Sequence, residues 1–169
     1  MNLIVAVAKD WGIGCENELL FRIPADHKYF RKTTTGKVVV MGHNTFKSLP
    51  GGKPLKDRVN IVLSRNPGLA IPGVTVCNCI EDLLVEIKKY NAEDVFVIGG
   101  EKIYTALLEY CTKAYVTKID AVLKSDTFFP NIDEMPEWEL VQNPEWNEHD
   151  GIRYRFCVYE RIGGNENGY

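Results

Sequence analysis

The sequence predicts a single α/β domain with a mostly parallel sheet, and three observations lead to this fold class. Short β-rich runs alternate with helical patterns along most of the 169 residues. Several of these runs are almost continuously apolar, as strands buried on both faces of a parallel sheet are. The alternation stops near the C-terminus, where two β-rich runs follow each other without a helix. Alternation favours right-handed crossovers and parallel strands, whereas the last pair favours an antiparallel addition.

Eight strands are expected in the sheet. Six alternate with helices, and they read NLIVAVA (2–8), KVVVMG (37–42), VNIVLS (59–64), VTVCNC (74–79), DVFVIGG (94–100) and AYVTKID (114–120). The last two, WELVQ (138–142) and GIRYRFCVYERI (151–162), are joined by a polar stretch at 143–150. This pattern predicts a hairpin that adds an antiparallel C-terminal strand to the sheet edge.

Four helices are expected to flank the sheet. They read PADHKYFRKTT (24–34), HNTFKSL (43–49), IEDLLVEIKKY (80–90) and EKIYTALLEY (101–110). Pro24 suits the first turn of the first helix. The third helix gathers Leu83, Leu84 and Ile87 on one face, which is the spacing of a helix packed on a sheet.

Composition is that of an ordinary globular chain, with 45% hydrophobic and 25% charged residues. The net charge of −3 argues against nucleic acid or an anionic membrane as a partner, because both attract basic surfaces. No apolar run approaches membrane-spanning length, and the apolar start lacks a basic leader. We expect a cytoplasmic monomer with one domain at 1–162 and a frayed, Gly/Asn-rich tail at 163–169.

Five cysteines are scattered along the chain, at positions 15, 77, 79, 111 and 157. Cys77 and Cys79 have strand spacing and so face one side, but the second ligand pair of a zinc site is missing. We therefore expect reduced thiols and no metal, as is usual in the cytosol.

Three expected strand ends have features suited to a phosphate-rich ligand. They are Val40–Thr45, Leu63–Arg65 and Val97–Lys102. Gly42 and the Gly99-Gly100 pair permit close backbone approach, and Arg65 adds a guanidinium. Each feature alone is more often an ordinary turn. Together they lie at carboxyl ends of strands, where open α/β sheets bind ligands. The usual dinucleotide fingerprint G-x-G-x-x-G is missing.

Asp26 is the acidic residue with the strongest case for a function. An acid in a first helical turn is usually solvated and stabilised by the helix dipole. However, Asp26, Tyr29 and Phe30 project near one face of the expected helix. If that face is buried, the carboxylate lies among apolar groups and needs a polar partner, which a ligand could supply.

A series of short motifs resembles the bacterial dihydrofolate reductase family. In order, the motifs are Asn2–Ala8, Gly14-x-x-Asn17, Ile23-Pro24-Ala25-Asp26-x-x-x-Phe30, Met41-Gly42-x-x-Thr45-x-x-Ser48-Leu49, Arg58, Leu63-Ser64-Arg65, Ile98-Gly99-Gly100-x-x-x-Tyr104, Thr117-x-Ile119-Asp120 and Asp126–Pro130. They cover nearly the whole chain, and their combination is far more specific than any one of them.

The resemblance implies reduction of 7,8-dihydrofolate to 5,6,7,8-tetrahydrofolate with NADPH. A hydride would go to pterin C6 and a proton to N5, in support of one-carbon metabolism and thymidylate synthesis. Diaminopyrimidine antifolates would be ligands as well. The resemblance also implies a cis peptide between Gly99 and Gly100, and a mobile loop at 9–23 that closes over the nicotinamide.

Roles for individual residues follow from the same resemblance. Asp26 would bind the pterin through paired charge-assisted hydrogen bonds, supported by Thr117. Arg58 would form a bidentate pair with the glutamate tail of the substrate. The catalytic set would be Asp26, Thr117, Leu19 and Phe21. The remaining substrate contacts would come from Ile4, Val5, Phe30, Lys53, Leu55 and Ile98.

The implied cofactor site is larger. Arg65, His43 and Lys102 would surround the adenosine 2′-phosphate, and Thr45 would contact the pyrophosphate. The implied contacts are Ala6, Ile13, Gly14, Asn17, Leu19, Gly42, His43, Asn44, Thr45, Leu63, Ser64, Arg65, Ile98, Gly99, Gly100, Glu101, Lys102, Ile103 and Tyr104.

Two residues depart from the family pattern. Phe21 replaces a usual tryptophan, which removes an indole N–H near the pterin carbonyl. His43 replaces a common arginine, so Arg65 and Lys102 must supply more of the charge for the 2′-phosphate.

Two other functions are compatible with parts of the pattern. A pyrimidine reductase of the riboflavin pathway would share the fold and NADPH but lack the Asp26–Phe30 motif and Arg58. A non-catalytic NADPH-sensing module would keep Gly99-Gly100 and Arg65 without needing Asp26 or Thr117.

Overall fold

The computed structural model describes residues 1–163, so the expected tail lies, after Gly163, outside the described residues. The main sheet runs in the order β10-β12-β8-β1-β7-β4-β5-β6. Its strands are β1 (Asn2–Val7), β4 (Val38–Gly42), β5 (Val59–Leu63), β6 (Thr75–Cys77), β7 (Val95–Gly99), β8 (Lys113–Ile119), β10 (Trp138–Gln142) and β12 (Ile152–Arg161). These are the eight strands that the sequence predicts.

The six strands from β8 to β6 in this order are parallel, so their carboxyl ends meet at one edge. Strand β12 is antiparallel and lies between β8 and β10, which makes the C-terminal hairpin the edge of the sheet. A ninth strand, β11 (Asn147–His149), also pairs with β12. It falls in the polar stretch that the sequence indicates only as a connection.

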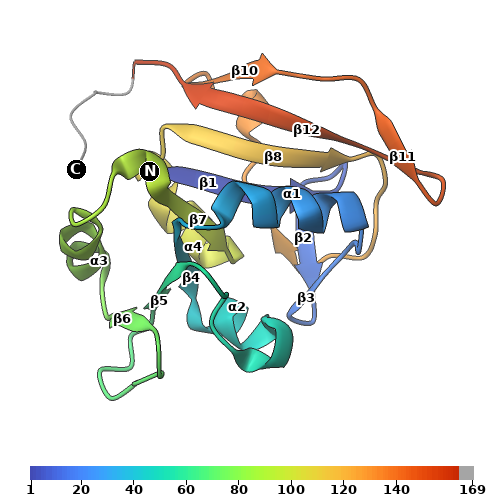
Figure 1. Cartoon of the computed structure of the whole chain (residues 1–169). Helices are drawn as coiled ribbons and strands as arrows, with labels where there is room; N and C mark the ends of the chain where they lie inside the picture. The colour runs from blue at the N-terminus through green and yellow to red at the C-terminus, as the bar shows by residue number, and fades with distance from the viewer. Residues whose placement is uncertain (164–169) are drawn as a thin grey trace.

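Four α-helices flank the sheet, as expected. They are α1 (Pro24–Thr34), α2 (His43–Ser48), α3 (Ile80–Ile87) and α4 (Glu101–Leu107). Short 3-10 turns occur at η1 (Pro50–Gly52), η2 (Ala92–Asp94), η3 (Leu108–Tyr110) and η4 (Ile132–Glu134). Helix α1 lies across β1 and β8 in Figure 1. In the described part of the chain, no helix is long and apolar enough to cross a membrane.

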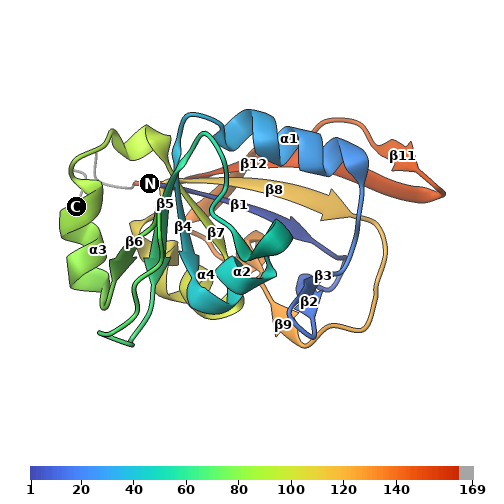
Figure 2. The ribbon, with the colours of Figure 1, turned by 60° about the horizontal axis from the view of Figure 1, so that its bottom comes forward.

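The segment at 9–23 forms part of a second, small sheet. Its strands are β2 (Gly12–Cys15) and β3 (Glu18–Leu19), and they are joined by β9 (Thr127–Phe128) in the order β3-β2-β9. These three strands gather beyond the carboxyl end of β1, apart from the main sheet (Figure 2). The loop at 9–23 is therefore held by β9, a segment that follows it by more than a hundred residues in the sequence.

The core divides between the two faces of the sheet. On one face, Leu3, Val5 and Val7 pack with residues of α3 and α4. On the other face, two separate clusters form: one joins β4 and β5 to Phe46 of α2, and the other joins Ile119 and Tyr154 to the start of α1. These two clusters do not merge, and we refer to the region between them, between α1 and α2 at the carboxyl ends of the central strands, as the opening.

Candidate active site

Asp26 and Thr117 meet at this opening. Asp26 lies in the first turn of α1, and Thr117 lies on β8, buried with 1% of its surface exposed. The Thr117 hydroxyl donates a hydrogen bond of 2.7 Å to the Asp26 carboxylate. Burial raises the pKa of Asp26 above its usual range, and this hydrogen bond and His27 oppose the rise only in part. The carboxylate therefore has a second oxygen available to a ligand in a largely desolvated position.

The neighbouring residues on α1 divide between core and opening. Tyr29 stacks on Phe156 of β12 with the ring centroids 4.2 Å apart, and this burial helps to raise the pKa of Tyr29 to about 12. The Arg58 guanidinium carbon lies 6.0 Å from the centroid of the Phe30 ring. His27 is exposed. Asp26, Phe30 and Arg58 thus follow one another along α1, from its first turn to its last residue, Thr34.

Arg58 is held in place by the backbone and by α1. Its Nε donates to the Lys56 carbonyl at 2.9 Å, and its Nη1 donates to the Thr34 hydroxyl at 3.0 Å. The segment that carries it is fixed by Asn60, a buried polar residue of β5 with 3% exposure. Asn60 accepts from the Leu55 N–H and donates to the carbonyls of Leu55 and Arg58. Lys53, at the start of this segment, is exposed.

The apolar candidates do not all face the opening. Leu55 and Ile98 are half-buried and pack in the same cluster with α2, and Phe21 packs with Ala6 near α1. Ile4 and Ala6 share a face of β1 because strand residues alternate. Val5 points to the opposite face, where it packs in the core with α3 and α4. The expected pterin wall therefore has to be corrected, because the Val5 side chain belongs to the core on the other face of the sheet.

The carboxyl ends of β4 and β7 come together through their glycines. A Cβ on Gly42 would approach Ile103 of α4 to 3.0 Å. The missing side chain at Gly42 therefore makes room for Ile103 and not, as expected, for a ligand. A Cβ on Gly100 would approach the Thr45 hydroxyl oxygen to 3.2 Å. The peptide between Gly99 and Gly100 is cis, which confirms that expectation. Bare backbone and a hydroxyl thus face each other at this edge.

Behind this edge, α4 is anchored to β1. The Tyr104 hydroxyl donates to the Ile4 carbonyl at 2.7 Å, and its ring packs edge-on against Phe129. Tyr104 is buried, and burial raises its pKa far above the usual range, so the hydroxyl stays a donor. This contact fixes the start of α4 relative to the open face of β1.

The cationic candidates lie on the surface. Arg65 and Lys102 are exposed, and His43 is half-buried at the start of α2. Leu63, which ends β5, is half-buried beneath them. Ser64 is fixed by Asn78, whose side chain donates to the carbonyls of Ser64 and Asn66 at 2.7 and 3.1 Å. Arg65 therefore extends from a braced turn at the carboxyl end of β5.

The loop at 9–23 contacts both α2 and β9. Asn17 donates to the carbonyl of Asn44 at 3.2 Å, which brings two cofactor candidates together. Asp126 accepts the backbone N–H of Glu16 at 2.8 Å, and its own N–H donates to the Gly14 carbonyl at 3.0 Å. Ile13 and Gly14 are buried in β2, whereas Leu19 on β3 is 66% exposed.

Comparison with known proteins decides the family. The dihydrofolate reductase family model matches residues 1–161. This chain belongs to the dihydrofolate reductase family. It is 35% identical over 170 residues to a dihydrofolate reductase of Bacillus subtilis, with 99% of this chain and 98% of the relative covered. It is 37% identical over 164 residues to one of Staphylococcus haemolyticus, with 96% of each chain covered.

Solved structures lead to the same family. A dihydrofolate reductase of Enterococcus faecalis, in complex with NADP(H) and the compound RAB-propyl, superimposes with a TM-score of 0.85. It is 32% identical, and 95% of each chain is covered. The bacterial dihydrofolate reductase resemblance and the fold class expected from the sequence are both confirmed.

Three residues support the site in this dihydrofolate reductase fold but are not among the site residues expected from the sequence. Asn60 and Asn78 brace segments at the opening, and Asp126 holds the loop. A polar residue within the apolar run VNIVL is a signal that could have identified Asn60. Asp126 lies 110 residues from Glu16, so no local pattern indicates their contact.

Proposed function

We propose that this chain reduces 7,8-dihydrofolate to 5,6,7,8-tetrahydrofolate with NADPH, and that Asp26 is the residue that orients the pterin. The observation that carries this proposal is the partly buried Asp26 carboxylate, which uses one oxygen to accept the Thr117 hydroxyl and keeps the other for a ligand. A pterin offers a ring N–H and an amino group to such a carboxylate, and paired charge-assisted hydrogen bonds result. Neither the pyrimidine reductase nor the NADPH-sensing module would provide this carboxylate with a ligand partner.

Residues at the opposite side of the opening fit NADPH. The Gly99-Gly100 backbone facing the Thr45 hydroxyl suits a pyrophosphate, because a side chain at either glycine would fill that space. Arg65 and Lys102 are exposed cations for the 2′-phosphate. When bound, the cofactor supplies the hydride for pterin C6.

The chain's own residues then control the proton. Hydride arrival at C6 requires a proton at N5. Among the described acidic and basic side chains in the first turn of α1, Asp26 is partly buried on Thr117, whereas His27 is exposed. We infer that water admitted by the loop at 9–23 delivers this proton. Asp26 stabilises the protonated pterin electrostatically while Thr117 fixes the carboxylate.

The proposed function is tested by mixing the protein with NADPH and dihydrofolate and following NADPH absorbance. Turnover with dihydrofolate, and none with a pyrimidine of the riboflavin pathway, supports it. Cofactor binding without oxidation would favour the sensing module instead.

We propose further that the protein acts as a cytoplasmic monomer. All five cysteines are free thiols in the structure, which agrees with a reducing compartment. The domain would comprise residues 1–162, followed by the short tail. Analytical ultracentrifugation at micromolar concentration tests the monomer.

Arg65→Ala is expected to weaken NADPH binding by about 1.5–3 kcal/mol, the range for a hydrogen bond to a charged group. NADH lacks the 2′-phosphate, so its binding should barely change. Equilibrium titration of both cofactors measures the difference. Equal losses with NADPH and NADH would show that Arg65 does not recognise the phosphate.

Diaminopyrimidine antifolates are expected to bind at Asp26 in their protonated form. Asp26→Asn should weaken such an inhibitor by about 2–5 kcal/mol, because one partner of a desolvated charge pair is lost. Calorimetric titration of wild type and variant gives the difference directly. An unchanged affinity would rule out the pairing.

A further inference from the structure

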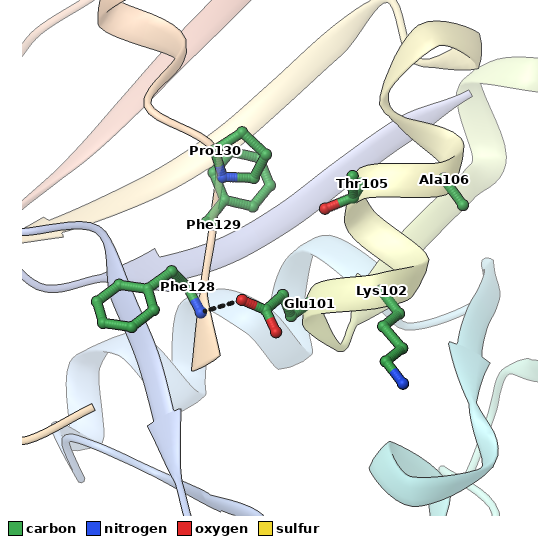
Figure 3. A pocket seen from close by; sticks show the side chains of 7 residues that line it. All are labelled: Glu101, Lys102, Thr105, Ala106, Phe128, Phe129 and Pro130. Atoms are coloured by element: carbon green, nitrogen blue, oxygen red, sulfur yellow. Dashed lines mark hydrogen bonds between the residues drawn. The ribbon is translucent and has the colours of Figure 1, made fainter. Parts of the chain in front are cut away.

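One hydrogen bond joins the start of α4 to strand β9 and has no part in the chemistry described above. The Glu101 carboxylate accepts the backbone N–H of Phe128 at 3.0 Å (Figure 3). The two residues border a pocket of about 540 Å³ between α4 and the segment at 128–130. Glu101 is thus the side chain through which α4 contacts β9 by a charge-assisted hydrogen bond, which is stronger than a neutral one.

Strand β9 is the edge strand of the small sheet, so β2 pairs with one side of it and its other side depends on contacts such as this one. It has only two residues, and the Phe128 side chain is 40% exposed. The next residue, Phe129, is buried against Trp11 and Tyr104, so it anchors the far end of β9 in the core. Glu101 therefore adds a second point of attachment, at the residue directly before this anchor.

Whatever fixes β9 also fixes the loop at 9–23. Strand β2 of the loop pairs with β9, and Asp126, the residue before β9, binds the backbone on either side of Cys15. A continuous chain of contacts thus leads from α4 through Glu101 and β9 to the loop. Glu101, the first residue of α4, directly follows the Gly99-Gly100 backbone.

We propose that Glu101 is a positioning residue that couples the loop at 9–23 to the pyrophosphate end of α4. With Glu101 in place, the loop at 9–23 stays closed over the bound cofactor, and the cofactor is released slowly. Without it, β9 and the loop open more often, and the cofactor escapes faster. The part that concerns cofactor release rests on the proposed function, whereas the attachment of the loop does not.

Two substitutions separate the hydrogen bond from the charge. Glu101→Ala removes both, while Glu101→Gln keeps a carbonyl oxygen that can accept from Phe128. In the free protein, hydrogen exchange at the Phe128 and Glu16 amides should accelerate about tenfold in the alanine variant, and the glutamine variant should recover most of the protection. Glu109→Ala, an exposed acid after the same helix, is the matched control and should leave both amides unchanged.

Stopped-flow release of NADPH provides the second readout. Release should accelerate about three- to tenfold in Glu101→Ala and only slightly in Glu101→Gln, with the KM for dihydrofolate unchanged. Unchanged amide exchange in the alanine variant would overturn the proposal, as would equal release rates in the two variants. If wild type failed to bind NADPH, the proposed function would fail, yet the exchange data would still decide whether Glu101 holds the loop.

Discussion

Asp26→Asn is expected to slow hydride transfer by about 100-fold or more at neutral pH, the scale of a lost ionisable group at the reacting centre. The amide can still accept the Thr117 hydroxyl, so the local geometry survives. It cannot stabilise a protonated pterin by charge. The rate should recover partly in acid, where the pterin is protonated without help. Single-turnover kinetics with deuterated NADPH across pH isolates this step.

The same substitution is expected to stabilise the fold, which distinguishes it from simple damage. Because the pKa of Asp26 is raised by burial, the native protein binds this proton more tightly than the unfolded chain. Stability is then greatest below the unfolded pKa of about 3.9 and declines as pH rises through the native value. Asparagine removes that decline. Asp26→Asn should therefore unfold at a higher temperature at pH 7 and close to wild type near pH 4.

Asp133 provides the matched control. Burial acts to raise its pKa, but hydrogen bonds from Lys118 and Tyr159 outweigh burial, and the pKa lies below its usual range. Asp133→Asn should therefore lower the unfolding temperature at pH 7 and leave hydride transfer near the wild-type rate. If Asp26→Asn kept the wild-type rate and pH profile, Asp26 would be only a structural residue of the first helical turn.

Asn60→Ala is expected to lower the free energy of unfolding by about 2–4 kcal/mol, because three hydrogen bonds to buried or half-buried backbone are lost together. These bonds fix the segment from Leu55 to Arg58. The KM for dihydrofolate should therefore rise several-fold as the Arg58 guanidinium loses its fixed position, while the KM for NADPH changes little. Chemical denaturation and steady-state kinetics measure the two effects.

Asn78→Ala is the natural comparison for Asn60→Ala. Asn78 braces the backbone around Ser64 in the same way, but beside Arg65 rather than Arg58. Its loss should raise the KM for NADPH and leave that for dihydrofolate nearly unchanged. The same pattern of KM changes in both variants would mean that the two asparagines act only through global stability.

The main sheet could be predicted because its strands carry their own signal. The run at 2–8 is apolar on both faces, and Pro24 marks the start of α1, so local chemistry and final structure agree. The small sheet of β2, β3 and β9 could not be predicted in this way. Its strands have two to four residues, and besides its neighbour β3, strand β2 pairs with β9 more than a hundred positions away.

The site divides along the same line. Asp26 and Arg58 can be predicted from the sequence because a motif identifies each of them individually. That Thr117 reaches Asp26, across 91 residues, depends on the pairing of β8 with β1 and on the angle of α1. The direction of the Val5 side chain cannot be predicted for the opposite reason: a run that is apolar at every position does not tell which face of the strand turns to the ligand.

The position of β12 has a consequence for synthesis of the chain. Strand β8 is complete at residue 119, but its outer neighbour begins only at residue 152. During translation, the outer backbone groups of β8 must therefore wait for β12, and β10 emerges before the strand to which it pairs. An unpaired strand edge of this kind attracts other chains. Nascent chains stalled before residue 152 should accordingly depend on the ribosome or on chaperones to avoid aggregation.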